Sequence, residues 1–442
     1  MPTQLLAQLY PTHLATLQKR AAEALQRAGF DHLLVAAGMP RYQFLDDVAY
    51  PFAVNPQFKA WLPVTKAPGS WLVITPGQRP KLIYLQPHDY WHVVPGAPSG
   101  YWVEHFDIVI IREAKDAAAH LPKDLARCAI VGDEGPAVGE AKPNTPEALL
   151  NYLHWHRAWK TDYELAMMRV ASKLGARAHR AAESAFRSGE SEYGIQMAYL
   201  AAAHETENEL PYSNIVCLNE HGAVLHYTDL DRNPPSVSHS FLIDAGASFH
   251  GYASDITRTY AGAGDEEFQQ LVTAMDVAQR GFCQQVQKGK NYADIHINAH
   301  HVLAGILREF DFVRMSPESM VESGTSATFF PHGLGHYIGL QVHDVGGFME
   351  NDAGGFVARP AGHPYLRLTR KLDAGQVMTI EPGLYFIDML LAELKQKPAA
   401  KDVNWAKVDA FRKYGGIRIE DDVACTEGES ENLTRDAFAA AA

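Results

Sequence analysis

Residues 241–260 read FLIDAGASFHGYASDITRTY and predict a tight hairpin that carries two carboxylates. The apolar start and the β-branched end of this stretch are typical of strands, and the His-Gly dipeptide at 250–251 is a two-residue hairpin turn. With that turn, Asp244 pairs with Thr257, and Asp255 becomes the diagonal neighbour of Asp244 on the same face. The register therefore predicts two aspartates that converge.

Diagonal neighbours on a sheet lie about 7–8 Å apart at Cα, which is within reach of polar side chains. On an arbitrary exposed hairpin, two such carboxylates would simply be solvated. If Asp244 and Asp255 are buried together, they repel each other and favour a cation between them. A divalent metal ion is the natural candidate.

Three later motifs favour the metal over solvation, because each places His or Glu beside glycines. They are PHGLGH at 331–336, TIEPG at 379–383 and GGIRIED at 415–421. Together with the hairpin they offer two Asp, one His and two Glu, an oxygen-rich set that suits hard or borderline divalent ions and can hold two of them if carboxylates bridge. The set excludes a Cys-rich zinc site.

The order Asp, Asp eleven residues on, HGxGH, TIEPG and GIRIED resembles the pita-bread metallopeptidases. Within that family the chain is most similar to bacterial prolidases, which are Xaa-Pro dipeptidases, and to organophosphorus acid anhydrolases, through QFLDD, FFPHGLGH and GLQVHDVGGFM. The resemblance covers nearly all 442 residues. It implies five metal ligands: Asp244, Asp255, His336, Glu381 and Glu420. Of these, Asp255 and Glu420 are expected to bridge the two metal ions.

The resemblance also implies an activity. We expect two divalent ions, in this family most often Mn²⁺, that activate a water for attack on the carbonyl before proline, with Glu381 transferring the proton. The substrate would be an Xaa-Pro dipeptide and the product free proline, with organophosphate triester hydrolysis as side chemistry. Two alternatives stay open: an aminopeptidase P-like enzyme that shares the ligands, and a metal-free pita-bread binding protein.

A second group of residues matches family positions around the substrate. Besides Glu381, the expected catalytic residues are His226, His332 and His343, which can hydrogen-bond substrate or a developing oxyanion. Arg418 and Arg367 are expected to hold the terminal carboxylate of the substrate, because a planar guanidinium binds a carboxylate in bidentate fashion. The expected pocket walls are Tyr212, Tyr292, Val342 and Leu366, and the residues expected to reach a partner's site in a homodimer are Asp47 and Trp91.

Each of these assignments has an ordinary structural alternative. Either arginine could instead orient a ligand carboxylate from the second layer of the site. An aromatic or aliphatic residue such as Tyr212 or Leu366 is by default part of the core.

The composition is that of an ordinary globular chain: 442 residues, 47% hydrophobic and 21% charged, enough for two domains. A formal net charge of −13 argues against a nucleic-acid partner. Charged residues interrupt the apolar positions of 1–30, so we expect no membrane segment and a cytoplasmic location. The four cysteines are scattered and predict buried free thiols.

Hydrophobic patterning predicts two domains with a boundary near residue 160. Residues 1–160 read as an α/β domain: a helix over 3–29, then short apolar strands near 33–36, 71–75, 81–85, 108–111 and 129–132. Thr161 and Glu164 fit a capping box that starts the second domain. Residues 161–442 read as α+β, with helices over 161–189, 191–206, 265–288 and 292–310, and the resemblance implies a curved antiparallel sheet with helices on its outside. The Gly- and Pro-rich stretch 350–365 predicts a surface loop.

Overall fold

The computed structural model describes residues 2–133 and 140–441, and the chain divides into two compact units. The first comprises Met1–Met167 with Met349–Gly355, and the second comprises Met168–Phe348 with Phe356–Ala442. The division falls inside helix α4 (Asp162–Arg187). The predicted domain boundary near residue 160 stays a prediction.

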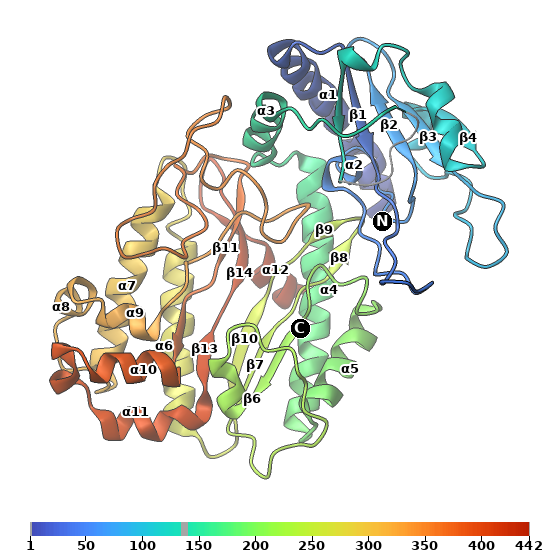
Figure 1. The fold of residues 1–442 in the computed structure, drawn as a ribbon. Coiled ribbons are helices and arrows are strands. Elements are labelled where there is room, and N and C mark those ends of the chain that lie inside the picture. Colours follow the sequence, from blue (N-terminus) through green and yellow to red (C-terminus); the bar gives the residue numbers. More distant parts are fainter. Residues whose placement is uncertain (1, 134–139, 442) are drawn as a thin grey trace. The chain divides into compact units, whose positions relative to one another are not determined.

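The first unit is an α/β domain around one mixed sheet (blue and cyan in Figure 1). Its strands run in the order β4-β3-β2-β1-β5, with β1 parallel to β5, β3 parallel to β4, and antiparallel pairs between. The predicted helix and all five predicted strands are present. The elements are α1 (Pro2–Ala28), β1 (His32–Ala36), α2 (Pro56–Lys59), β2 (Trp71–Ile74), β3 (Lys81–Leu85), β4 (Asp107–Ile111), β5 (Cys128–Val131) and α3 (Glu147–Arg157).

Long amphipathic helices flank the small antiparallel sheets of the second unit, as the resemblance implied (Figure 1). Helix α5 contacts strand β6, α6 contacts β10 and β11, and α12 contacts β14. The helices are α4, α5 (Glu192–Ala203), α6 (Glu266–Cys283), α7 (Tyr292–Glu309), α8 (Pro317–Glu322), α9 (Thr325–Phe329), α10 (Asp388–Lys395), α11 (Trp405–Phe411) and α12 (Leu433–Ala440). The predicted capping box is confirmed, since Thr161 N donates to Glu164 Oε2 at 2.8 Å and Glu164 N donates to Thr161 Oγ1 at 3.4 Å.

The strands of the second unit form four short sheets, ordered β10-β7-β6, β11-β14-β15, β12-β13 and β8-β9. They are β6 (Ile215–Leu218), β7 (Ser240–Asp244), β8 (Ser248–Phe249), β9 (Tyr252–Ala253), β10 (Thr257–Ala261), β11 (Val377–Ile380), β12 (Gly383–Tyr385), β13 (Gly416–Arg418), β14 (Asp421–Ala424) and β15 (Glu431–Asn432). An isolated antiparallel bridge between Thr257 and Glu420 links the first two of these sheets.

The central hairpin has the predicted register. Asp244 pairs with Thr257, and Phe249 pairs with Tyr252 around the 250–251 turn. His250 has φ +49° and Gly251 has φ +89°, and two consecutive positive φ angles are the signature of the type I′ turn, whose twist matches that of the strands. The turn therefore fixes which face carries the two aspartates.

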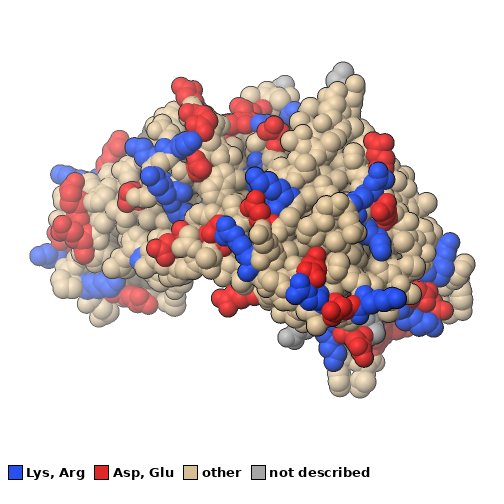
Figure 2. Space-filling model, turned by 90° about the horizontal axis from the view of Figure 1, so that it is seen from above, with Lys and Arg blue, Asp and Glu red and all other residues tan. Residues whose placement is uncertain are grey.

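The four cysteines are buried free thiols, as predicted. On the face shown in Figure 2, acidic and basic side chains are interspersed. Among the residues described, no helix combines the length and the apolar character needed to span a bilayer.

Candidate metal centre

The predicted metal ligands come together inside the second unit. Asp255, His336 and Glu420 are all buried, and each offers one ligand atom within 4.8 Å of the other two. Glu381 joins them through its Oε1, which lies 3.7 Å from His336 Nε2. Asp244 joins through a shared partner, because the Tyr212 hydroxyl is 2.8 Å from Asp244 Oδ1 and 2.5 Å from Asp255 Oδ1.

Backbone pairing explains why residues so distant in sequence converge. Asp244 ends strand β7, and its pairing partner Thr257 accepts a hydrogen bond from Glu420 N at 3.0 Å. The 331–336 segment runs beside strand β11, since His336 O accepts from Thr379 N at 2.9 Å and Leu334 O accepts from Glu381 N at 2.8 Å. Each ligand thus lies on or next to a paired strand, and such elements hold side chains more precisely than loops do.

His336 is oriented by its own backbone neighbourhood. Its Nδ1 lies 3.0 Å from the carbonyl oxygen of Tyr337, so Nδ1 carries the proton and Nε2 faces the carboxylates. Nε2 lies 3.5 Å from Asp255 Oδ2. Close packing requires glycine at 335: a Cβ there would come within 2.1 Å of the Thr379 carbonyl oxygen, and φ is +156°. The HGLGH pattern is therefore a steric requirement as well as a ligand motif.

The electrostatics of the cluster favour cations. Burial raises the pKa of Glu420 well above its usual range, and the neighbouring Asp255 and Glu381 carboxylates raise it further. Burial also raises the pKa of Glu381 to about 7. Burial alone would lower the pKa of His336, but the Asp255 and Glu381 carboxylates raise it to about 9. Four carboxylates and one imidazole in a buried cluster fit one or two divalent ions, whose charge would remove this repulsion.

Arg418 is the cation that the chain itself supplies. It is 4% exposed, and its Nη2 donates to Asp244 Oδ2 at 2.7 Å. Its Nη1 donates to the Tyr385 hydroxyl at 2.8 Å, and its Nε donates to Thr257 Oγ1 at 3.3 Å. The guanidinium therefore orients a predicted metal ligand, which was the structural alternative to binding the substrate carboxylate.

Arg367 differs from Arg418 in its surroundings. Its side chain is exposed and forms no hydrogen bond or ion pair within the part of the chain that the structure describes. Its charge acts on His343, whose pKa is lowered by burial first and by His336 and Arg367 in addition. The guanidinium is thus available to an anion near His343.

Two of the three histidines expected around the substrate, His332 and His343, lie beside the carboxylate cluster, and the third, His226, acts electrostatically on both of them. The ring of His343 is 4.4 Å from that of His336, centroid to centroid. His226 is exposed, and His343 also stays accessible to solvent although its ring is partly desolvated. His332 is half-buried, with Nδ1 3.7 Å from Glu381 Oε2 and Nε2 2.8 Å from the Tyr385 hydroxyl. Their catalytic roles stay predictions.

The residues expected to wall the substrate pocket differ in their burial and in their contacts. Tyr212 is hydrogen-bonded to two predicted ligands, Tyr292 is fully buried with its hydroxyl donating to Thr379 O at 2.8 Å, and Leu366 is 1% exposed. Val342 is half-buried. Asp47 and Trp91 belong to the first unit and are exposed, Trp91 by 78%. The structure leaves their substrate and partner roles as predictions.

Sequence reasoning did not single out three residues that support the cluster. The Thr257 hydroxyl donates to Glu420 Oε2 at 2.7 Å, and Asp422 Oδ2 accepts from Asp255 N at 3.1 Å. The Tyr385 hydroxyl links Arg418 to His332. Strand alternation could have found Thr257, which pairs with Asp244, whereas the roles of Tyr385 and Asp422 depend on contacts between distant segments.

Comparison with known proteins is consistent with this site. Residues 8–155 match the family model "Xaa-Pro dipeptidase, N-terminal domain", and residues 166–427 match "Metallopeptidase family M24". The chain is 60% identical over 433 residues to a protein of Stenotrophomonas maltophilia (strain K279a) named Xaa-Pro dipeptidase, covering 98% of each chain. It is 59% identical over 441 residues to the Xaa-Pro dipeptidase of Xanthomonas euvesicatoria pv. vesicatoria (strain 85-10), covering 100% of each.

Solved structures show the same fold at low sequence identity. Proline aminopeptidase P II from Yersinia pestis aligns with a TM-score of 0.71 at 23% identity, covering 98% of both chains. An aminopeptidase of Pseudomonas aeruginosa aligns with a TM-score of 0.70 at 22% identity, covering 97% of this chain and 98% of that one. The fold is thus the pita-bread fold with an N-terminal α/β domain, and the chain belongs to metallopeptidase family M24.

Proposed function

We propose that the protein is a metal-dependent hydrolase that cleaves Xaa-Pro dipeptides and releases free proline. The observation that carries the proposal is the convergence of Asp244, Asp255, His336, Glu381 and Glu420 in one buried cluster. The names of relatives about 60% identical over the whole chain support the substrate class.

The five residues would hold two divalent ions, with Asp255 and Glu420 as bridges, and we propose Mn²⁺ as the ion. Oxygen-rich coordination with one imidazole also permits Co²⁺, Fe²⁺ or Zn²⁺. Which ion is bound therefore also depends on the metal that the cell supplies. Such ions would supply Lewis acidity to the scissile carbonyl and lower the pKa of the attacking water.

The chain's own groups would move protons and bind substrate. Glu381 lies at the half-buried edge of the cluster, where its carboxylate can accept the proton of the attacking water and deliver it to the proline nitrogen. His343 and His226, both exposed next to the cluster, can donate hydrogen bonds to the developing oxyanion. His332, held by Tyr385, would border the proline ring.

Arg367, more than Arg418, would bind the terminal carboxylate of the substrate. Its guanidinium is exposed, whereas that of Arg418 is already hydrogen-bonded at Nη1, Nη2 and Nε. Arg418 would contribute mainly by orienting Asp244. A carboxylate clamp at one end of the site would restrict the substrate to dipeptides, which separates this activity from that of an aminopeptidase.

We also propose a homodimer in which Asp47 and Trp91 take part. Two segments of the first unit expose large apolar side chains, including Phe44 and Leu45 in one and Trp91 and Val93 in the other, each at least 78% exposed. Monomeric proteins rarely expose such residues in groups without a partner.

A substrate panel tests the proposal. Ala-Pro, Ala-Pro-amide, Ala-Pro-Ala and a phosphotriester are offered to the enzyme after chelation and again after addition of Mn²⁺. We expect hydrolysis of Ala-Pro only with metal, and much slower cleavage of the other peptides. Equal kcat/KM for Ala-Pro and Ala-Pro-Ala would move the assignment to aminopeptidase P. No activity with any added metal would favour a binding role, and phosphotriester hydrolysis would establish the side chemistry.

A further inference from the structure

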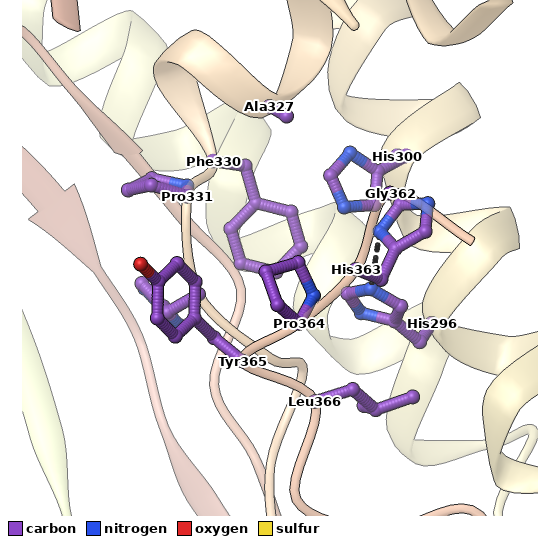
Figure 3. A pocket seen from close by; sticks show the side chains of 11 residues that line it. His296, His300, Ala327, Phe330, Pro331, Gly362, His363, Pro364, Tyr365 and Leu366 are labelled. Carbon is purple, nitrogen blue, oxygen red and sulfur yellow. Dashed lines mark hydrogen bonds between the residues drawn. The ribbon is translucent and has the colours of Figure 1, made fainter. Parts of the chain in front are cut away.

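A second cluster of potential metal-binding side chains lies in the second unit and shares no residue with the carboxylate cluster. It consists of His296 and His300 on helix α7 and His363 in the loop that precedes Leu366. His296 and His300 are four residues apart and therefore share one face of the helix. Figure 3 shows the three imidazoles turned toward one another at the edge of a small cavity. Each offers one ring nitrogen within 4.8 Å of the other two.

Hydrogen bonds define the nitrogens that are free to bind an ion. His300 Nδ1 lies 3.0 Å from Ser326 Oγ, while His300 Nε2 is buried and has no hydrogen-bond partner among the described residues. His296 Nε2 lies 2.9 Å from His363 Nδ1. His296 Nδ1 is also buried without a partner in the described chain. Both helix histidines are 1% exposed.

Buried polar atoms are satisfied in the great majority of cases, so the unpartnered Nε2 of His300 needs a reason. A bound cation would provide one. Burial lowers the pKa of His296 to about 2 and that of His300 to about 3, so both rings are neutral at pH 7. A neutral imidazole is the form that binds a metal ion.

The space beside the histidines has the size of a single ion or water. The cavity measures about 20 Å³ and is otherwise bordered by rings and small residues such as Phe330, Pro331 and Pro364. The Phe330 ring lies 4.8 Å from the His300 ring, centroid to centroid. An apolar border of this kind limits solvent access to a metal site.

We propose that His296, His300 and His363 form a mononuclear transition-metal site, of the class that binds Zn²⁺, with water as the fourth ligand. Three imidazoles and one open position are a known zinc ligand set. In a tetrahedral site the ligand nitrogens are about 3.3 Å apart, since Zn–N bonds of about 2.0–2.1 Å meet at about 109°. His296 Nε2 and His363 Nδ1 lie 2.9 Å apart, and the ligand nitrogens of the three histidines all lie within 4.8 Å of one another, so the observed separations are compatible with this value.

Another group of potential metal ligands in the second unit differs from the histidine cluster. Glu192, His221 and Asp231 also come close enough to hold an ion. There the Glu192 carboxylate already accepts hydrogen bonds from Leu218 N, Tyr227 Oη, Asp231 N and the His221 ring, at 2.7–2.8 Å. That group is satisfied by the protein, whereas His300 Nε2 in the histidine cluster has no partner among the described residues.

The location suggests a structural role beside the active site. The cavity is also lined by His332 and Leu366, both of which were expected in the substrate pocket. An ion held by α7 and by His363 would anchor the loop 362–366 to the helix. This site does not depend on the proposed function, because its ligands are separate from the carboxylate cluster.

Metal stoichiometry tests the site directly. The full-length protein is stripped with chelator and titrated with Zn²⁺, and bound metal is measured per chain for the wild type, H363A and the control H301Q. His301 lies next to His300 on α7 but does not line the cavity. We expect the wild type and H301Q to bind one ion more per chain than H363A. Loss of His363 should lower the affinity of the histidine site for Zn²⁺ at least about 100-fold. Even the removal of a residue that only hydrogen-bonds to a metal ligand lowers metal affinity about 10–100-fold.

Cobalt gives an independent readout. Co²⁺ in a tetrahedral nitrogen site absorbs visible light much more strongly than Co²⁺ in oxygen-rich sites of higher coordination. The intense band should appear in the wild type and H301Q and be missing in H363A. If H363A is misfolded by circular dichroism, H363N replaces it. Equal stoichiometry and equal spectra for the wild type and a folded His363 variant would overturn the proposal.

Discussion

Arg418 Nη2 donates to Asp244 Oδ2 at 2.7 Å in a buried ion pair, so the arginine of the GIRIED motif orients a predicted metal ligand. Substrate recognition then depends more on Arg367, which is exposed. The two arginines, which the sequence treats alike, should therefore give different phenotypes.

The first prediction concerns Arg418→Met. Removing the guanidinium leaves Asp244 buried without its partner, and we expect metal affinity to fall about 10–100-fold, as when other partners of metal ligands are removed. Metal content after dialysis at limiting Mn²⁺ measures the effect. Arg367→Met is the matched control and should keep the metal content of the wild type. Equal metal retention by both variants would contradict this role of Arg418.

The second prediction concerns the expected bridging carboxylates. Asp255→Asn and Glu420→Gln should each lose at least one ion per chain and nearly all activity, because a bridge contacts both ions. Metal analysis together with turnover of Ala-Pro checks this. Near-normal metal content and turnover in either variant would show that the residue is not a bridge.

The third prediction addresses stability. Asp421 is fully buried, and Arg258 and Arg435 hold its pKa at about 2 although burial alone would raise it. Arg435 Nε donates to Asp421 Oδ2 at 2.7 Å, and its Nη2 donates to Asp276 Oδ1 at 2.7 Å. Arg435→Met should cost about 2–4 kcal/mol, since it removes one of the two arginines that balance the buried Asp421 charge and leaves Arg258 as the other.

Thermal unfolding of the metal-loaded protein measures that loss. Arg314→Met is the control, because its ion pair with Asp311 is exposed and exposed pairs contribute little. An unchanged midpoint for Arg435→Met would show that the remaining partners, Arg258, Gln279 and Asn432, suffice for Asp421.

The sequence predicted features that depend on local chemistry. The type I′ turn at 250–251 determined the register of the aspartate hairpin, and the capping box at Thr161 determined where α4 begins. The partner of Arg418 was not predictable in the same way. Asp244 lies 174 positions away, and strand alternation placed Arg418 on the face of Glu420 without showing which carboxylate it would reach.

The histidine cluster illustrates the same limit. The four-residue spacing of His296 and His300 is visible in HINAHH. Two histidines on one helix face do not by themselves predict a metal site, because a third ligand is needed. His363 comes from the stretch 350–365, which composition identified only as a loop. Irregular segments lack a repeating pattern, so their side-chain positions depend on tertiary contacts that the sequence does not display.

The last prediction is a pH dependence of stability that comes from Glu205. Its Oε1 accepts from Ser248 N at 2.9 Å, whereas its Oε2 is buried without a partner among the described residues. Burial raises the pKa of Glu205 from 4.5 to about 7. The folded state therefore binds a proton between pH 4.5 and pH 7 that the unfolded state has released, and this contribution to stability is lost as the pH rises through that range.

Glu205→Gln keeps the acceptor for Ser248 N and removes the charge. At pH 8 the variant should be more stable than the wild type by about 1 kcal/mol. This is less than the free energy that corresponds to the whole pKa shift, because the carboxyl is only half-buried and solvent screens its charge. At pH 4.5 the two proteins should unfold at nearly the same temperature. Melting of both metal-loaded proteins between pH 4.5 and pH 8 measures the difference. Glu209→Gln, at an exposed neighbouring carboxylate, should show a smaller pH-dependent gain. A constant difference between wild type and Glu205→Gln at all pH values would mean that the carboxyl keeps its ordinary pKa.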